Sequence, residues 1–156
     1  MIELQIPGKE IIRIEHLVVD YNGTLAVGGD PLSGCLERLR RLAERVEVHV
    51  VTADTFGGVA SHVDEQAFKL EILPVERQDE AKASYVRELG LRTTAAIGNG
   101  ANDARMLREA ALGLAVVQAE GAAAAAIQNA DAVFTHINDA LDALLDPKRL
   151  VATLRT

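Results

Sequence analysis

Polar and charged side chains stand directly behind several apolar runs of this chain, at positions where they can do chemistry. They are Asp20 and Asn22 after the first run, Thr52 after the second, Asn99, Asn102 and Asp103 after a later one, and Lys82 between these groups. An aspartate can act as a nucleophile, while a hydroxyl and an ammonium can bind phosphoryl oxygens. Carboxylate and amide oxygens are ligands for a hard Mg²⁺ ion. The set therefore predicts phosphoryl transfer through Asp20.

The apolar runs predict the strands that would position these side chains. They cover residues 17–20, 46–51, 70–73, 93–97, 112–117 and 132–134. Helical patterns separate them, including a glycine-containing helix expected from about Phe56, and this alternation predicts an α/β fold. We expect a Rossmann-like, doubly wound parallel sheet with helices on both faces. In such a sheet ligands bind beyond the carboxyl ends of the strands, so residues far apart in sequence can converge on one crevice.

Two further elements are expected in the first third of the chain. Residues 2–14 alternate imperfectly around Pro7-Gly8, which predicts a two-stranded β-ribbon attached at a sheet edge. Asp30 predicts a helix cap, with Pro31 in the first turn of a helix that carries Cys35 on its apolar face. Cys35 is therefore interpreted as core packing and not as a reactive thiol.

Lys82 and the histidines are the titratable side chains whose surroundings matter most. Lys82 lies near the start of an expected helix, where the helix dipole disfavours a cation. It is either solvated or held for a bound anion, and its position alone does not decide between the two. The four histidines, His16, His49, His62 and His136, have no metal-ligand spacing, so structural or solvated roles are expected.

Composition limits the classes of protein that the chain can represent. A length of 156 residues with 49% apolar and 25% charged residues predicts one globular domain over residues 1–156. A net charge of −7 and few aromatic residues argue against binding phosphate backbones or stacked bases, so no nucleic-acid partner is expected. One cysteine allows no internal disulfide. Since neither a signal peptide nor a membrane span is recognisable, we expect a cytoplasmic protein without a membrane partner.

The arrangement of these residues resembles the haloacid dehalogenase (HAD) superfamily over nearly the whole chain. Asp20-Tyr21-Asn22-Gly23-Thr24 is similar to its first motif, Val50-Val51-Thr52 to its second, Lys82 to its third and Gly98-Asn99-Gly100-Ala101-Asn102-Asp103 to its fourth. The fourth motif resembles the hinge motif of P-type ATPases, and the chain looks like the small soluble P-type ATPases that correspond to a phosphorylation domain alone. Since the sequence contains no membrane part and no inserted nucleotide-binding domain, we do not expect a pump.

The resemblance implies a role for each candidate residue. Asp20 would become an aspartyl phosphate, Asn22 would stand at the acid/base position, and Thr52 and Lys82 would hold the phosphoryl group. Gly23, Ala53 and Asn102 would lie beside the transferred group. Asp20, the backbone carbonyl of Asn22, Asn99 and Asp103 would bind a Mg²⁺ cofactor. The substrate would be a small phosphorylated molecule.

Two asparagines depart from the family's phosphatases, which carry aspartates at both positions. The aspartate at the position of Asn22 protonates the leaving group and later activates water, and an amide can do neither. General acid/base catalysis contributes about a hundred- to ten-thousand-fold in rate, so hydrolysis should be slow. P-type ATPases also lack this acid, and the resemblance implies a phosphoenzyme that persists. The aspartate at the position of Asn99 ligates the metal, so its loss should weaken Mg²⁺ binding.

These losses leave other functions open. A non-catalytic module would accept phosphate or a phosphometabolite in the same crevice and report it to a partner protein. A dehalogenase-type hydrolase would also use Asp20 without an acid two residues later, although the fourth motif resembles the metal-binding kind. No insertion provides a cap domain, so we expect the site to be open or to be closed by a neighbouring subunit of a homo-oligomer.

The two asparagines also share a local property. Asn22-Gly23 and Asn99-Gly100 are pairs in which the unhindered glycine nitrogen can attack the side-chain amide. One hypothesis is that deamidation restores the missing carboxylates after synthesis. The other is that Asn-Gly pairs simply suit tight turns.

Overall fold

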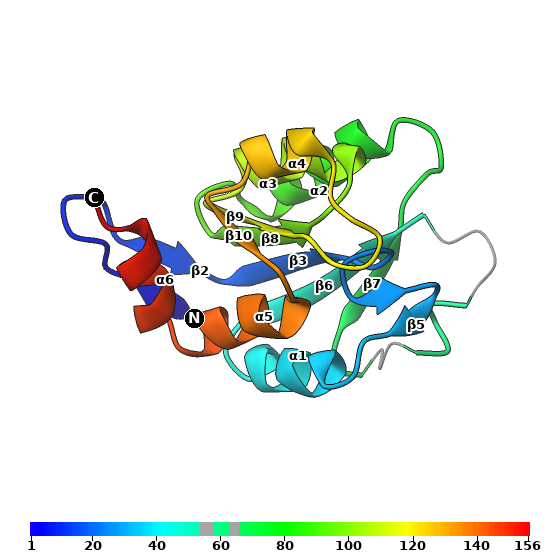
Figure 1. The fold of residues 1–156 in the computed structure, drawn as a ribbon, viewed down its shortest axis with the longest axis horizontal. Helices are drawn as coiled ribbons and strands as arrows, with labels where there is room; N and C mark the ends of the chain where they lie inside the picture. Colours follow the sequence, from blue (N-terminus) through cyan, green and yellow to red (C-terminus); the bar gives the residue numbers. More distant parts are fainter. Residues whose placement is uncertain (54–57, 63–65) are drawn as a thin grey trace.

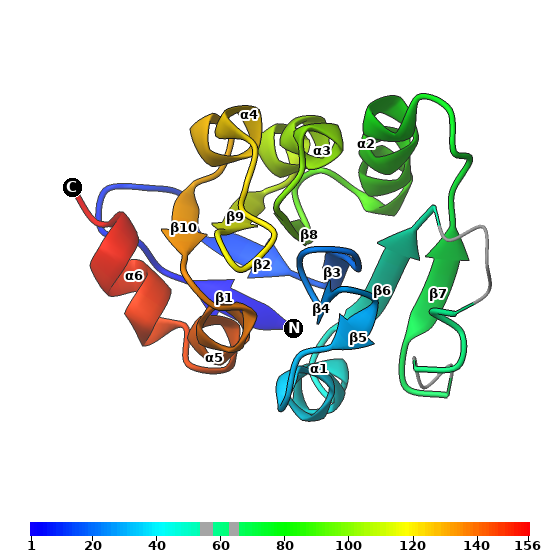
Figure 2. The same cartoon turned by 45° about the vertical axis from the view of Figure 1, so that its right-hand side comes forward.

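A six-stranded parallel sheet forms the centre of the computed structural model, which describes residues 1–53, 58–62 and 66–156. Its strands are β3 (His16–Asp20), β6 (Glu47–Thr52), β7 (Lys69–Ile72), β8 (Thr94–Gly98), β9 (Leu112–Val116) and β10 (Ala132–Phe134). They lie in the order β10-β9-β8-β3-β6-β7 (Figure 2), and all neighbouring pairs are parallel. The chain leaves β3 toward one edge through β6 and β7 and later fills the other side from β8. Asp20 therefore ends the strand at the switch point, where doubly wound sheets bind ligands.

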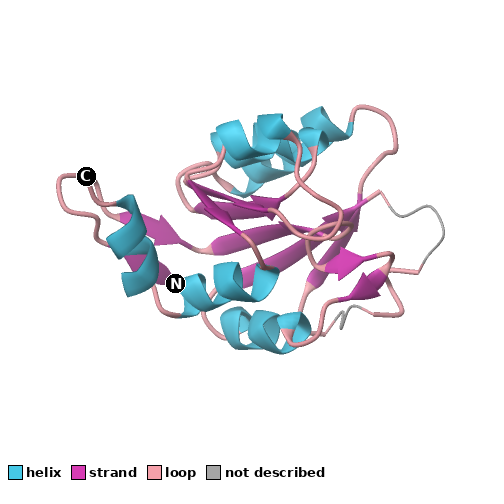
Figure 3. Cartoon of the chain, viewed as in Figure 1, coloured by secondary structure: helices cyan, strands magenta, loops and turns pink. Residues whose placement is uncertain are grey.

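Helices cover both faces of this sheet (Figures 1 and 3). On one face lie α1 (Cys35–Ala43) and α5 (Ile137–Leu145), and on the other lie α2 (Gln78–Leu89), α3 (Ala104–Glu109) and α4 (Ala124–Gln128). The predicted doubly wound fold is confirmed. Each predicted strand limit is within one residue of the observed one, because buried parallel strands leave continuous apolar runs in the sequence.

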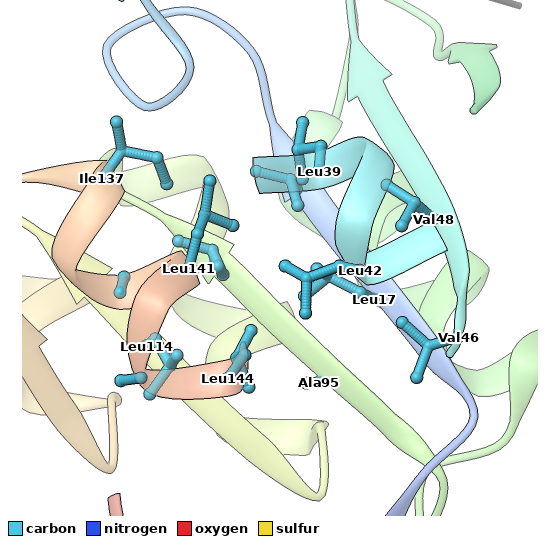
Figure 4. Packing of buried hydrophobic residues seen from close by; sticks show 14 of the residues in the cluster. Leu17, Leu39, Leu42, Val46, Val48, Ala95, Leu114, Ile137, Leu141 and Leu144 are labelled. Carbon is cyan, nitrogen blue, oxygen red and sulfur yellow. The ribbon is translucent and has the colours of Figure 1, made fainter. Parts of the chain in front are cut away.

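Alternation along the strands divides the core into two layers. Leu17 and Val19 of β3 pack with α1 and α5, whereas Val18 packs with α2 and α3. Figure 4 shows the first layer, in which Leu39, Leu42, Leu141 and Leu144 of the helices lie over Leu17, Ala95 and Leu114 of the strands. Each fully buried leucine contributes roughly 1.5–3 kcal/mol by leaving water. The two layers together hold the strand ends that carry the polar residues.

The ribbon predicted over residues 2–14 is present as the antiparallel pair β1 (Ile2–Leu4) and β2 (Ile12–Ile14). Its predicted attachment at a sheet edge is wrong, because it forms a separate two-stranded sheet beside α6 (Lys148–Leu154) (Figure 2). The chain turns between the two sheets at Glu15, whose amide donates to the Thr93 carbonyl at 2.8 Å. The ribbon thereby buries its apolar side chains in the first core layer, which an edge position would leave half exposed.

The helix predicted to start at Asp30 begins later, which is a second correction. Residues Asp30–Pro31 form the strand β5, which pairs with β4 (Ala26–Val27) in a hairpin turned by Gly28-Gly29. Both glycines have positive φ, a conformation that glycine adopts at little cost. Proline is tolerated in this short edge strand because no ladder bond needs its missing N–H. α1 starts at Cys35, whose burial agrees with the predicted core role.

The start of the glycine-containing helix predicted from about Phe56 lies outside the described residues, and the described residues 58–62 form turns where that helix was expected. Within the described part of the chain, no cap domain covers the sheet, and no helix is long and apolar enough to cross a membrane. The β4–β5 hairpin and the loop after β9 flank the carboxyl ends of the central strands (Figure 1).

Candidate active site

A crevice of about 370 Å³ opens at the carboxyl ends of β3, β6 and β8. Six of the predicted site residues line it, namely Asp20, Asn22, Thr52, Ala53, Asn99 and Asn102. The other three, Gly23, Lys82 and Asp103, are buried and lie against these lining residues. The structure therefore brings together all nine residues from four separate stretches of sequence, because the parallel strands end at one edge of the sheet.

Lys82 is fully enclosed and holds two carboxylates of the protein. Its ammonium lies 2.7 Å from Asp20 Oδ1 and 2.6 Å from Asp103 Oδ1, and only 2% of its side chain is exposed. It is the fifth residue of α2, on the face of that helix that packs against the sheet. The alternative of a solvated lysine is therefore wrong. A buried charge needs such partners, because its desolvation otherwise costs several kcal/mol.

The pKa values of this buried cluster indicate that an additional cation would be favourable beside Asp20. The pKa of Asp20 is raised to about 7, first by burial and then by the negative charge of Asp103, while Lys82 acts in the opposite direction. Burial by itself would lower the pKa of Lys82, but the two carboxylates outweigh it and raise that pKa, so the lysine stays charged. Two carboxylates share one ammonium, which leaves room for a second positive charge beside Asp20.

Asp103 is anchored on its far side by the backbone of the same loop. Its Oδ2 accepts hydrogen bonds from the amides of Asn99 (3.0 Å) and Gly100 (2.8 Å), while Oδ1 receives Lys82. A Cβ at Gly98 would lie 2.5 Å from the Asp103 carboxyl carbon, so only glycine fits there. Both carboxylate oxygens are thus engaged inside the protein. Direct metal ligation by Asp103 stays a prediction.

Thr52 contributes a hydroxyl that the described residues leave without a partner. The residue is 1% exposed, and its Oγ1 makes no hydrogen bond within residues 1–53, 58–62 and 66–156. Buried polar atoms in native proteins are almost always paired, so an orphaned hydroxyl at the wall of a crevice indicates a missing ligand oxygen. Because Thr52 ends β6 beside Asp20, which ends β3, that oxygen would sit next to the candidate nucleophile.

Asn99 is held so that its oxygen faces the nucleophile. Its Oδ1 accepts from the Thr24 hydroxyl (3.3 Å), which also lies 3.1 Å from Asp20 Oδ2, and its Nδ2 donates to the Gly121 carbonyl (3.0 Å). A Cβ at Gly23 would come within 2.4 Å of Nδ2, and Gly23 has a φ of +81°, so glycine is required there. A carboxylate at position 99 would lose the bond to Gly121. The deamidation hypothesis gains no support at this site.

The donor set fits Mg²⁺ on chemical grounds. Asp20 can supply a carboxylate, Asn99 an amide oxygen and Asn22 a backbone carbonyl, and oxygen ligands completed by water are what Mg²⁺ takes. The excess of carboxylates over ammonium around Asp20 also favours a cation. Only one of the three donors is charged, which agrees with weak binding.

Comparison with known proteins identifies the family of the chain. Residues 53–146 match the family model of the haloacid dehalogenase-like hydrolases. The chain belongs to this family. The resemblance predicted from the four motifs is confirmed, and with it the class of hydrolase in which the crevice is to be understood.

Individual relatives of this HAD-like chain cover different shares of it. The uncharacterized protein MJ0073 of Methanocaldococcus jannaschii is 52% identical over 60 residues, which are 38% of this chain and 64% of that protein. The match therefore spans less than two thirds of the relative's length. Among solved structures, the 3-deoxy-D-manno-octulosonate 8-phosphate phosphatase of Moraxella catarrhalis, bound to magnesium, phosphate and KDO, has a TM-score of 0.72 over 92% of this chain and 95% of that chain, at 16% identity.

A P-type ATPase has the same fold within a much longer chain. A zinc-transporting PIB-type ATPase in its E2.Pi state matches with a TM-score of 0.61 and 23% identity over 80% of this chain and 20% of that chain. At such identities the likeness shows the fold alone. That fold is the one used by phosphatases of the HAD family.

Two polar residues that line the crevice of this HAD-like chain were not predicted from the sequence. Gln78, the first residue of α2, lines the crevice and accepts a hydrogen bond from Asn102 Nδ2 (2.7 Å). Glu120 lines it from the loop after β9 and is exposed. Gln78 stands four residues before Lys82, one helical turn away, so the helical period was a usable signal. The sequence signal for Glu120 was weaker: it follows β9, which ends at the same edge of the sheet as β3 and β8.

Proposed function

We propose that this chain is a Mg²⁺-dependent phosphohydrolase or phosphotransferase that works through an aspartyl phosphate on Asp20 and turns over slowly. The observation that carries the proposal is the presence, in one crevice, of a firmly held Asp20 carboxylate and the orphaned Thr52 hydroxyl. A phosphoryl group attached to Asp20 would bring acceptor oxygens to that hydroxyl. Membership of the HAD-like hydrolases supports this chemistry.

In the proposed first step, a carboxylate oxygen of Asp20 attacks phosphorus opposite the leaving group. A new bond forms between the Asp20 oxygen and phosphorus, the bond from phosphorus to the leaving oxygen breaks, and that oxygen departs with the bonding electrons. Lys82 and Thr24 hold the attacking carboxylate, and Thr52 donates to a phosphoryl oxygen. Mg²⁺, held by Asp20, Asn99 and the Asn22 carbonyl, would offset the charge of the phosphoryl oxygens.

In the second step the acyl phosphate is broken. Water, or the hydroxyl of an acceptor in a transferase, attacks phosphorus, its proton passes to solvent, and the bond between phosphorus and Asp20 breaks to restore the carboxylate. Asn22 stands where the family's phosphatases place the acid/base, and its amide offers no proton. Both the departure of a basic leaving group and the activation of water are therefore unassisted, which makes the phosphoenzyme long-lived.

A labelling experiment tests the proposal. Protein incubated with Mg²⁺ and acetyl phosphate, which has a good leaving group, should gain one phosphate on Asp20, found by peptide mass spectrometry and removed by hydroxylamine. Asp20→Asn should take up none. If neither labelling nor turnover of p-nitrophenyl phosphate appears in the natural chain or in the variant with both Asn22→Asp and Asn99→Asp, the catalytic proposal is wrong.

A non-catalytic phosphate-binding module is the second candidate function, and the hydrogen bonds of the Asn99 side chain favour it. The Asn99 amide is bonded to Gly121 and Thr24 as a neutral structural group, where a phosphatase would carry a charged metal ligand. This candidate predicts that phosphate and beryllofluoride bind, with phosphorus or fluorine NMR as the measurement, while Asp20 is never labelled. Most side chains that line the crevice are polar, which gives no support to a dehalogenase-type reaction.

We propose that residues 1–156 act as one HAD-like core domain, since both core layers pack on the same sheet. Without a cap domain in the described residues, the crevice suits small phosphorylated molecules, and a second subunit of a homo-oligomer would be needed to close it. A cytoplasmic location stays a prediction.

A further inference from the structure

Three metal-binding side chains meet at the opposite end of the sheet from the crevice. His16 begins β3, and Glu47 and His49 stand near the beginning of β6. In the parallel register His16 pairs with Glu47, and His49 follows two residues later, so all three side chains project from the same face of the sheet. His16 lies four residues before Asp20 on β3, about 13 Å along the strand. The cluster is therefore separate from the candidate active site.

The spacing of the donor atoms matches one small metal ion. His16 Nδ1 and His49 Nε2 are 3.2 Å apart, and His49 Nε2 and Glu47 Oε1 are 3.4 Å apart. All three donor atoms lie within 4.8 Å of one another. Ligands about 2.0–2.1 Å from a tetrahedral Zn²⁺ are separated by about 3.3 Å. The side chains need only small rotations to converge on one ion.

Tyr85 orients the buried histidine of the cluster. Its hydroxyl lies 2.8 Å from His49 Nδ1, and His49 is 1% exposed. Metal-bound histidines almost always donate their second ring N–H to a hydrogen-bond acceptor, which fixes the ring and leaves the other nitrogen for the metal, and the tyrosine oxygen can be such an acceptor. Here Tyr85 occupies Nδ1, and the other ring nitrogen, Nε2, faces His16 and Glu47.

The cluster also has an open side. A hollow of about 560 Å³ lies beside it, with His16, Glu47, Glu15 and Glu44 in its wall. The Glu47 side chain is 41% exposed and His16 is half-buried, so solvent reaches the cluster and a water molecule can complete the coordination. The Lys69 ammonium contacts Glu47 Oε1, but 63% of the Lys69 side chain is exposed, so this surface ion pair can be exchanged for a metal bond at little cost.

We propose that His16, Glu47 and His49 bind one Zn²⁺ ion, with water as the fourth ligand. Two imidazoles and one carboxylate are a ligand set that zinc takes in proteins, and the remaining position stays open to solvent. The competing explanation is a plain hydrogen bond between the two histidine rings at 3.2 Å. The two explanations differ in the effect of Glu47, which has no part in the bond between the rings.

Zinc titration tests the proposal. Zinc-free protein is kept in excess Mg²⁺, which occupies the crevice. It should bind about one Zn²⁺ per chain in competition with a coloured chelator. Its thermal midpoint should rise, because the ion binds the folded chain. Co²⁺ in place of Zn²⁺ should give the intense visible absorption of a four-coordinate site.

Variants locate the ion. His16→Gln and Glu47→Gln should each weaken Zn²⁺ binding at least about tenfold, and Tyr85→Phe should weaken it by on the order of 10- to 100-fold. The matched controls are His62→Gln, an exposed histidine outside the cluster, and Glu44→Gln, an exposed glutamate of the same hollow. Both controls and Asp20→Asn should bind zinc like the natural chain.

If His16→Gln and Glu47→Gln bind zinc as tightly as the two controls, or if the natural chain binds none, the cluster is only a hydrogen-bonded pair of histidines. Both variants lie at the surface side of the cluster, and their thermal midpoints without metal show whether they fold. Buried His49 is left unchanged in every variant for this reason.

Discussion

Asn22 exposes its side chain at the crevice, where an amide can neither give a proton to a leaving group nor take one from water. Aspartate can do both, so we expect Asn22→Asp to speed hydrolysis of the phosphoenzyme by about 10²- to 10⁴-fold. Release of phosphate from labelled protein measures the rate. Asn22→Ser removes the amide without supplying an acid and should stay slow. Equal acceleration in both variants would show that loss of the amide, and not gain of the acid, is responsible.

Thr52 allows binding to be separated from stability. Thr52→Val keeps the shape of the side chain and removes a hydroxyl that has no partner among the described residues, so the free energy of unfolding should change by less than about 1 kcal/mol. Phosphate affinity should fall about 10- to 100-fold, because a hydrogen bond to a charged group contributes about 1.5–3 kcal/mol. Denaturant unfolding and phosphate titration measure the two quantities.

Thr94 provides the matched control for this substitution. It is buried too, but its hydroxyl donates to the Gly90 carbonyl at 2.8 Å, at the far end of β8 from the crevice. Thr94→Val should therefore show the reverse pattern, with lower stability and unchanged phosphate affinity. If Thr52→Val behaves like Thr94→Val, the Thr52 hydroxyl has a structural role and the main support for a phosphoryl site is lost.

At the scale of elements, α2 links the buried charges to the rest of the fold. Lys82→Met would leave Asp20 and Asp103 facing each other without a cation, and breaking a buried pair in this way costs about 3–5 kcal/mol. Lys69→Met removes an exposed lysine of β7 and should cost less than about 1 kcal/mol. Urea unfolding at pH 8 compares them. Equal losses in the two variants would mean that Lys82 does not neutralise the cluster.

Strands and helices differed in how far the sequence could predict them. Buried parallel strands such as β8 were placed within one residue, because their apolar runs are continuous and end in polar residues. The start of α1 was misplaced because Asp30 and Pro31 suit both a helix start and a turn into an edge strand. Pairing with β4 decided between them, and pairing partners are not a local property.

The candidate site was predictable for a reason that does not extend to the histidine cluster. Every predicted site residue ends or follows a strand or lies one helical turn inside a helix, and parallel strands bring their carboxyl ends together in any register. His16 and His49 meet because His16 of β3 pairs with Glu47 of β6, two residues before His49. A shift of one residue would send the side chains to opposite faces, so their spacing in sequence carried no signal.

On the scale of the whole molecule, the ends of the sheet serve different purposes. The carboxyl end gathers carboxylates around Lys82, and the amino end gathers His16, Glu47 and His49. Both sets lie on the face covered by α2, which supplies Lys82 to one and Tyr85 to the other. A single helix therefore supports both proposed sites, and its burial against the sheet determines the geometry of each.

The raised pKa of Asp20 makes the stability of the whole molecule depend on pH. Its folded-state pKa of about 7 exceeds the ordinary value of 3.8, first because of burial. The protonated group therefore adds stability that is complete below pH 3.8 and is lost as pH rises through 7. Asp20→Asn removes the penalty of the buried charge, while Lys82 keeps Asp103 as its partner.

We therefore expect Asp20→Asn to be more stable than the natural metal-free chain at pH 8, by on the order of a few kcal/mol, with less than half of that difference at pH 5 and none below pH 3.8. In a chain of this length each kcal/mol moves the thermal midpoint by about 2–4 °C. Mg²⁺ should raise the midpoint of the natural chain at pH 8 but not that of Asp20→Asn, because the ion offsets the same charge. A variant that is less stable at both pH values would instead show that ionised Asp20 is held favourably by Lys82, and that the crevice has no electrostatic need for a metal ion.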